Sequence, residues 1–307
     1  MVSKSCVLLC LLNYLVFPTC LLSAPHVSSF PYLAPDTFRQ FCTFVLDEDA
    51  SFDPALVQKG DFVYVKPEFF EQFFSTYHPY ITCCYILILQ DSDLDTPGAY
   101  KKYLDDEKIF MWFARNMDCF HPKLQPIPIG LVNQISPYGD IEIISQVIQQ
   151  LEHGNIPNKL LLYLNFGISH VSHDERRHVF ALFESAPFCT VVRPDAQGLN
   201  AAIPLHQYLH DLAHHKFVLS PRGIGVDCYR TWEAMLVGCI PIVKSSVLDV
   251  LYEDLPVLIV NDWHEVTENF LNKTYELMST KTYNLEKLYA PYWLDRIARY
   301  QEQLRNS

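Results

Sequence analysis

The second half of the sequence alternates between short continuous apolar runs and longer stretches in which apolar residues recur with a helical period. Continuous apolar runs are typical of buried parallel strands, and the helical period indicates amphipathic helices. The apolar runs predict strands at 160–164, 188–192, 217–219, 240–243 and 257–260. The periodic stretches predict helices at 174–183, 205–214, 229–236 and 265–278. Strands that alternate with helices in this way favour a parallel α/β sheet.

The first half of the sequence shows the same alternation. Apolar runs predict strands at 62–65, 85–89, 109–113 and 125–129, and periodic stretches predict helices at 67–77, 99–104 and 141–153. We therefore expect a second parallel, doubly wound sheet. A long amphipathic helix is predicted at 283–303, after both halves. The predicted fold class is α/β, with two Rossmann-type halves.

These elements divide the chain into four parts. They are a leader at 1–24, an N-terminal α/β half at 25–153, a C-terminal α/β half at 154–280 and a last helix at 281–307. The stretch 154–158 is rich in turn-forming residues, so we expect it to link the two halves.

The leader begins with a short basic segment and continues through an uncharged apolar run. This pattern is typical of a signal peptide. The run is also just long enough to span a bilayer, so membrane attachment through residues 6–22 is an alternative, and a buried N-terminal element is another. A signal peptide or an anchor predicts the secretory pathway or export. The destination would be the Golgi or endoplasmic reticulum lumen in a eukaryote, and the membrane or periplasm in a bacterium.

Composition narrows the classes of partner. The net charge of −12 disfavours nucleic acid and anionic membrane surfaces, so any phosphate would have to be bound by local arginines. The ten cysteines include no Cys-x-x-Cys pair, and we expect no metal site.

The stretch 217–243 carries the strongest chemical signal. It predicts a strand, a loop with Gly223 and Gly225, a helix with Asp227 as its N-cap, and a second strand. A glycine loop that opens into a helix N-terminus presents backbone N–H groups and a positive dipole end, which suit a phosphate. NAD is not expected, because Cys228 stands where a dinucleotide fingerprint has its third glycine. Two arginines and a glutamate lie close by in the sequence: Arg222, Arg230 and Glu233.

This stretch resembles the exostosin family of glycosyltransferases (family 47). The resemblance is carried by Ser220-Pro221, Gly223, Asp227-Cys228, Arg230, Trp232-Glu233-Ala234 and Gly238-Cys239-Ile240-Pro241. It implies a GT-B-type fold, in which two halves face a cleft and a C-terminal helix crosses back to the first half. It also implies transfer of a sugar, with inversion, from a nucleoside diphosphate sugar to a glycan or glycoprotein hydroxyl. The expected donor is a UDP-sugar, and no cofactor is expected.

The resemblance extends less strongly over residues 60–300. It includes Trp112-Phe113 and the run from His121 to Gly130 in the first half. Related sequences often carry His-Asn-Ser-Asp where this chain has Leu89-Gln90-Asp91-Ser92-Asp93. The histidine is absent here, which leaves a catalytic role for that position open.

The candidate residues of the 217–243 stretch have functional and structural interpretations. Arg222 and Arg230 would bind the donor diphosphate through bidentate hydrogen bonds. The helix N-terminus with Gly223, Gly225 and Asp227 would stabilise the same diphosphate as it leaves. The alternative for the arginines is a surface ion pair, or for Arg230 a pair with Asp227. Glu233, among apolar neighbours, would hold the donor ribose or sugar; the alternative is an ion pair with Arg230 one helical turn away.

Further candidates follow the predicted strand 160–164, at the sheet edge where ligands bind in such folds. Asn165, Arg176 and Arg177 are predicted to contact the donor phosphates. The histidines of this stretch are expected to be loop residues rather than metal ligands: His170, His173 and His178.

Asp91 and Asp93 follow the predicted strand 85–89. In a GT-B setting we predict that one of them is the general base that deprotonates the acceptor hydroxyl. A solvated turn is the alternative. The sequence as a whole predicts a GT-B-like glycosyltransferase. The alternative function is a non-catalytic nucleotide- or carbohydrate-binding protein on the same fold.

Overall fold

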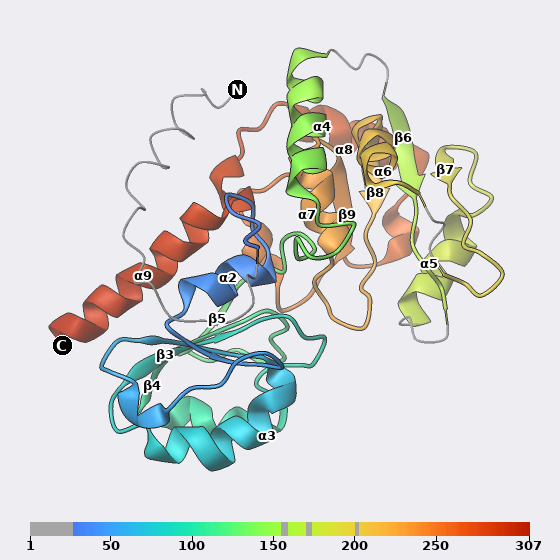
Figure 1. The fold of residues 1–307 in the computed structure, drawn as a ribbon. Helices are drawn as coiled ribbons and strands as arrows, with labels where there is room; N and C mark the ends of the chain where they lie inside the picture. Colours follow the sequence, from blue (N-terminus) through green and yellow to red (C-terminus); the bar gives the residue numbers. More distant parts are fainter. Residues whose placement is uncertain (1–26, 155–158, 170–173, 200–202) are drawn as a thin grey trace.

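The computed structural model describes residues 27–154, 159–169, 174–199 and 203–307. The predicted leader and most of the predicted linker lie outside these ranges. The predicted fold class is confirmed, because the described residues form two five-stranded parallel sheets covered by helices, as in a GT-B-like two-domain architecture (Figure 1). Within these ranges, no helix combines the length and the apolar character that a membrane-spanning segment needs.

The strands of the first sheet lie side by side in chain order. They are β1 (Phe44–Leu46), β2 (Phe62–Val65), β3 (Tyr85–Leu89), β4 (Ile109–Ala114) and β5 (Leu124–Pro126). The prediction of a doubly wound sheet is therefore wrong for this half. Right-handed crossovers that always step in the same direction put their connections on one face of a sheet. The other face is left for α2 (Pro35–Phe41) and the C-terminal helix (Figure 1).

The connections of the first sheet are helical but irregular. They are η1 (Pro54–Leu56), η2 (Pro67–Phe69), α3 (Phe70–Gln72), η3 (Phe73–Tyr77), η4 (His78–Tyr80) and η5 (Gly98–Asp105). The predicted helix 67–77 thus changes from 3-10 to α to π geometry, and the predicted helix 99–104 is a 3-10 helix. Packing explains this: Phe70 and Phe74 both contact the ring of the buried Trp112. Aromatic burial decides the local geometry more than helix propensity does.

The second sheet has the order β10-β9-β8-β6-β7, and the doubly wound prediction is confirmed here. Its strands are β6 (Leu160–Leu164), β7 (Cys189–Val191), β8 (His215–Leu219), β9 (Ile240–Lys244) and β10 (Leu258–Val260). The chain begins in the middle of the sheet, adds β7 on one side, and then returns to add β8 on the other. A crevice forms at such a reversal, at the carboxyl ends of the two strands.

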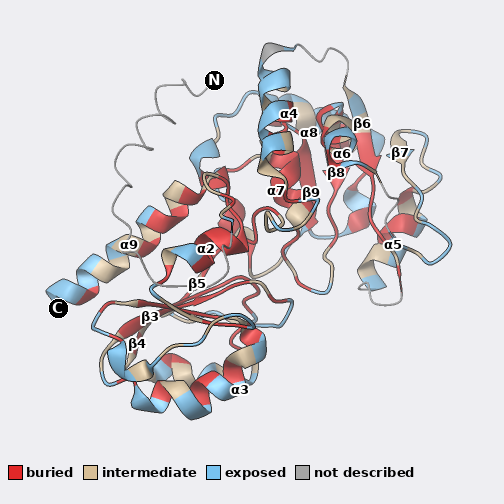
Figure 2. Cartoon of the chain, viewed as in Figure 1, coloured by how far each residue is buried: buried red, intermediate tan, exposed pale blue. Residues whose placement is uncertain are grey.

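The helices around this sheet agree with the prediction to within a few residues. They are α4 (Ile141–His153), α5 (Asp174–Phe183), α6 (Leu205–Ala213), α7 (Tyr229–Leu236) and α8 (Glu268–Ser279), with short 3-10 turns η6 (Asp249–Tyr252), η7 (Trp263–Glu265) and η8 (Leu285–Leu288). Helix α7 is buried between both halves (Figure 2). Its Trp232 and Met235 belong to the core of the first sheet, whereas Ala234 packs into a core shared with α4 and α6.

The C-terminal helix α9 (Ala290–Asn306) crosses back over the first sheet, as predicted (Figure 1). Trp293 and Ile297 are buried in the core of that sheet, and the ring of Tyr300 contacts Phe113. The helix begins later than the predicted residue 283, because Pro291 in the first turn presets the helical backbone there.

Candidate functional site

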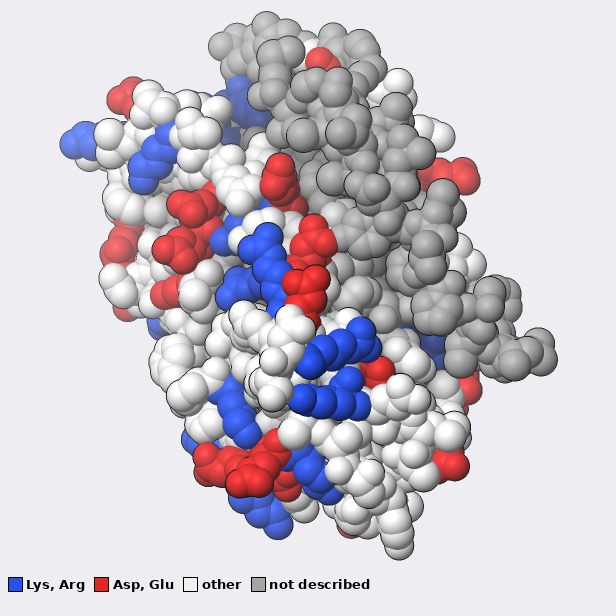
Figure 3. Space-filling model, turned by 90° about the vertical axis from the view of Figure 1, so that its left-hand side faces the viewer, with Lys and Arg blue, Asp and Glu red and all other residues white. Residues whose placement is uncertain are grey.

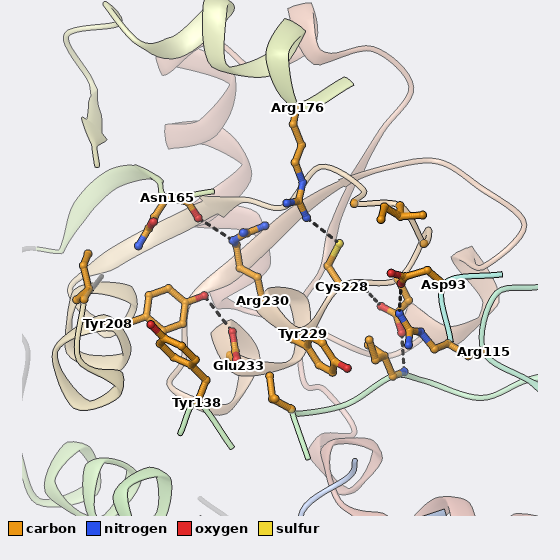
Figure 4. A pocket seen from close by; sticks show the side chains of 17 residues that line it. Asp93, Arg115, Tyr138, Asn165, Arg176, Tyr208, Cys228, Tyr229, Arg230 and Glu233 are labelled. Atoms are coloured by element: carbon orange, nitrogen blue, oxygen red, sulfur yellow. Dashed lines mark hydrogen bonds and ion pairs between the residues drawn. The ribbon is translucent and has the colours of Figure 1, made fainter. Parts of the chain in front are cut away.

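A cavity of about 510 Å³ opens between the two halves, at the carboxyl ends of β6 and β8 (Figure 4). This is the point of strand-order reversal in the second sheet, where ligands bind in open α/β proteins. The volume falls within the ~300–1,000 Å³ that ligand pockets span. Among the residues predicted for the site, all line the cavity except Asp91, Arg177 and Arg222.

Arg230 lies in the first turn of α7 with only 7% of its surface exposed. Its Nε donates to the carbonyl oxygen of Asn165 at 3.1 Å, and its guanidinium lies 5.4 Å from the ring centroid of Phe166. Its Nη1 is buried and has no hydrogen-bond partner among the described residues. Neither the carbonyl group nor the ring carries a negative charge, so an anionic ligand could still pair with this buried guanidinium group.

Arg176 reaches the same cavity from α5. Its Nε donates to the carbonyl oxygen of Arg222 at 3.0 Å, and its Nη2 lies 3.8 Å from Sγ of Cys228 (Figure 4). Burial, and after it the charge of Arg230, lowers the pKa of the Arg176 guanidinium. A half-buried and a buried guanidinium group that repel each other favour an anion between them.

Glu233 lies one turn after Arg230 and is 7% exposed. Its Oε2 accepts a hydrogen bond from the Tyr208 hydroxyl at 3.0 Å. Burial raises the pKa of Glu233 to about 6, although the Tyr208 hydrogen bond and the Arg230 charge act in the opposite direction. Of the two interpretations of Glu233, the ion pair with Arg230 does not form within the described residues, so this carboxylate is also available to a ligand.

Asp227 lines the cavity and has a structural role there. Its carboxylate is 2% exposed and accepts from four donors: the backbone N–H groups of Ile129 and Cys228, the Trp232 indole and the Tyr252 hydroxyl. The N-cap of α7 is Cys228, so the predicted capping role of Asp227 is wrong, and the alternative pair with Arg230 does not form either. Asp227 instead fastens the glycine loop to the first half through Ile129.

The two predicted glycines allow close approaches. A Cβ at Gly223 would lie 2.9 Å from Nη2 of Arg176, so the loop must be bare where that arginine crosses it. A Cβ at Gly225 would lie 2.8 Å from Nδ2 of Asn116 and 3.1 Å from Oδ1 of Asp93. The first half therefore packs directly on the glycine loop, and Oδ1 of Asn116 accepts from the N–H of Val226 at 3.2 Å.

The two predicted catalytic carboxylates occupy different places. Asp93 lines the cavity opposite α7, and its Oδ1 accepts from Nη2 of Arg115 at 2.8 Å. Asp91 has a φ of 62°, which turns the chain, and its Oδ1 accepts from Nδ2 of Asn133 at 3.3 Å, outside the cavity. Burial raises the pKa of Asp91. The structure thus brings Asp93, and not Asp91, to the cleft.

Arg222 also points elsewhere than predicted. Its Nη2 donates to the carbonyl oxygen of Ile224 at 2.8 Å, so the side chain braces its own loop. Its contribution to the cavity is the carbonyl group that holds Arg176. Arg177 donates to the carbonyl oxygen of Ser169 and pairs with Asp174 at the surface of α5.

Several cavity residues were not predicted from the sequence, among them Arg115, Tyr208 and Tyr138. Arg115 follows β4 as Asp93 follows β3, so the rule that ligands bind at the carboxyl edge could have found it. Tyr208 lies on the apolar face of α6 with several leucines, so the sequence pattern marks it as a core residue. Its hydrogen bond to Glu233 cannot be predicted from that pattern. Tyr138 lies in an irregular segment, where no pattern marks it.

On the face that Figure 3 shows, basic and acidic side chains lie next to each other in small groups. Among the residues with described positions, no cluster of three or more His, Cys, Asp or Glu side chains could hold a metal ion. His170 and His173 lie outside the described residues. The arginines of the cavity are thus the cations that the structure places at this site.

Residues 164–305 match the family model of the RXYLT1 C-terminal domain. This family is related to glycosyltransferases, and the match supports a glycosyltransferase-like function. The matched range includes the glycine loop, α7 and all but the last residue of α9. The narrower assignment to the exostosin type is not confirmed by it. No curated protein matches the chain at a significant level.

Proposed function

We propose that this protein is an exostosin-like glycosyltransferase that transfers a sugar from a nucleoside diphosphate sugar to a hydroxyl group of a glycan or glycoprotein. One observation carries the proposal. Arg176 and Arg230 are held by backbone carbonyls at the strand-order reversal, and neither is paired with a carboxylate among the described residues. Arginine forms bidentate hydrogen bonds with phosphate, so the pair suits a diphosphate.

The proposed chemistry follows from the two walls of the cavity. When the bond between sugar and diphosphate breaks, negative charge grows on the diphosphate, and Arg176 and Arg230 stabilise it. On the opposite wall, Asp93 accepts the proton of the acceptor hydroxyl while the hydroxyl oxygen attacks the anomeric carbon. Attack from the side opposite the leaving diphosphate inverts the configuration. Glu233 accepts hydrogen bonds from the donor ribose.

The matched family also suggests which donor to test first. It is a family of xylosyltransferases, so UDP-xylose heads the panel, followed by other UDP-sugars and GDP-sugars. We further propose that residues 1–24 direct the chain to the secretory pathway or anchor it there.

The test measures nucleotide binding and turnover with the full-length protein. Isothermal titration should show UDP binding, and release of UDP from one UDP-sugar should increase with a suitable acceptor. Arg230→Ala should weaken UDP binding by about 100-fold, because a charge-assisted pair of hydrogen bonds is lost. Arg193→Ala is the matched control, since Arg193 lies in the same half but pairs with Glu184 at the surface, 2.8 Å away.

The outcomes separate the two candidate functions. If no nucleotide binds, the donor site is wrong. If nucleotide binds through Arg230 but no sugar is transferred or hydrolysed, the protein is a nucleotide-binding protein without catalysis.

A further inference from the structure

The chemical groups of the cavity change in one direction along its length. Tyr138, Tyr208 and Glu233 lie at one end, Arg230 and Arg176 come next, and Asp93 lies with Arg115 at the other end (Figure 4). A nucleoside diphosphate sugar has the same order of groups: an aromatic base, a ribose diol, a diphosphate and a sugar. The cavity can therefore bind such a donor along its length.

The reverse orientation is unfavourable. It would place the base against the ion pair of Asp93 and Arg115, where the aromatic ring of Tyr229 in the cavity wall already lies against the Arg115 guanidinium. It would also place the anomeric carbon beside Glu233, on the wall away from the proposed base. Only the orientation with the nucleobase at the tyrosine end brings the transferred sugar to Asp93.

Tyr138 offers the open aromatic surface at that end. It is 47% exposed, whereas the Tyr208 hydroxyl is already bound to Glu233. A third tyrosine of the cavity, Tyr229, lies 5.9 Å from the guanidinium of Arg115 and therefore belongs to the opposite end. A flat, half-exposed ring in a cavity wall is suited to stacking on a nucleobase.

The segment that carries Tyr138 is anchored on both sides. Before it, the N–H of Leu131 donates to the carbonyl oxygen of Leu33 at 2.7 Å, and the N–H of Gln134 donates to Asp36 at 3.0 Å. After it, a Cβ at Gly139 would lie 2.2 Å from the carbonyl oxygen of Asn133, so the chain turns tightly there. Little backbone conformational entropy is therefore lost when a ligand meets this residue.

We propose that Tyr138 is the residue on which the nucleobase of the donor stacks, and that it selects nucleotide over simple diphosphates. The inference rests on the proposed function, because it assumes that the donor is a nucleoside diphosphate sugar. It assigns a binding role to a residue between β5 and α4, outside the 217–243 stretch that carries the strongest resemblance to the exostosin family.

The test compares two probes, UDP and inorganic pyrophosphate, on three variants of the full-length protein. Tyr138→Ala should weaken UDP binding by roughly 10- to 100-fold, as expected for the loss of one stacked base, and leave pyrophosphate binding unchanged. Tyr138→Phe keeps the ring and should retain UDP binding within about threefold. Tyr80→Ala is the matched control, because Tyr80 is 66% exposed and lies outside the cavity.

Each outcome has a distinct meaning. Unchanged UDP binding in Tyr138→Ala, with normal binding in the wild type, overturns this inference and leaves the proposed function intact. Equal losses for UDP and pyrophosphate also overturn it, because the substitution would then have disturbed the arginine site instead. If wild-type protein binds neither probe, the proposed function itself fails.

Discussion

The two parallel sheets of this protein differ in strand order, and as a result the two halves contribute different numbers of residues to the cavity. In the second sheet the order reverses between β6 and β8, and the residues that follow these strands form most of the cavity. In the first sheet the strands follow chain order and no reversal creates a crevice. The first half instead contributes single residues from its carboxyl edge, such as Asp93 and Arg115.

Under the proposed function, the second half binds the donor while the first half supplies the general base. The arrangement depends on a firm contact between the halves, which Asp227 and Asn116 provide through their hydrogen bonds across the cleft. The shared core around Trp232 adds to it. Substitutions that affect only one half, or only the contact between the halves, test this assignment of roles.

The largest effect is expected from Asp93→Asn, which removes the proposed base from the first half. Turnover should fall by about 10²- to 10⁴-fold, the usual contribution of a general base, while UDP affinity stays within about twofold. Acceptor-dependent UDP release and titration calorimetry measure the two quantities. Asp95→Asn is the control in the same turn, and Asp91→Asn should keep most of the activity because Asp91 lies outside the cavity. Equal losses in the Asp91 and Asp93 variants would contradict the division of labour.

A smaller effect is expected from Gly225→Ala, in which the added methyl group crowds the contact between the halves. The new Cβ would lie 2.8 Å from Nδ2 of Asn116, a side chain that is 1% exposed and cannot move away freely. Overpacking of this kind costs about 1–3 kcal/mol of unfolding free energy. Turnover should fall more than UDP affinity, because Asp93 is displaced from the donor. Urea unfolding and steady-state kinetics test this, with the exposed Gly154→Ala as control. A variant as stable and active as wild type would show that the contact is loose.

The smallest effect concerns Glu233, whose hydrogen-bond partner Tyr208 lies in the same half. Because its pKa rises from 4.5 to about 6 on folding, the folded protein binds the proton more tightly than the unfolded chain does. Stability should therefore fall as the pH rises from 4.5 to 6, by up to about 2 kcal/mol, and the cost should persist at higher pH. Glu233→Gln should remove this cost above pH 6 and equal the wild type below pH 4.5.

Chemical denaturation at several pH values measures that difference, and the exposed Glu302→Gln serves as control. Binding of a UDP-sugar should show the opposite trend. It should weaken in the wild type as Glu233 is protonated, and change little with pH in Glu233→Gln. A UDP-sugar is the right probe because its esterified diphosphate lacks the phosphate pKa near 6 that free UDP has. A parallel pH dependence in both proteins would exclude Glu233 as the source.

Strongly periodic segments were predicted well, and short or irregular ones were not. The bounds of α4, α5, α7 and β6 agree with the prediction, because each carries several turns or a full apolar run of unambiguous pattern. Helix α2 and strand β1 were missed, since seven and three residues are too few to display a period. Asn165 and Arg176 were found because they follow a clear strand, and Tyr138 was not, because nothing local distinguishes it.

The sequence by itself determined the strands and helices, the glycine loop and the arginine and glutamate of α7, because hydrophobic period and turn chemistry depend on residues close together in the chain. Only the tertiary structure decided the strand order of the first sheet and the position of Asp91 and Arg222 outside the cavity. It also decided that Tyr138, Arg115 and Glu233 line the same cleft. These features depend on contacts between residues that are distant in sequence. No local pattern encodes them, because the free energy that selects them comes from packing the two halves around α7.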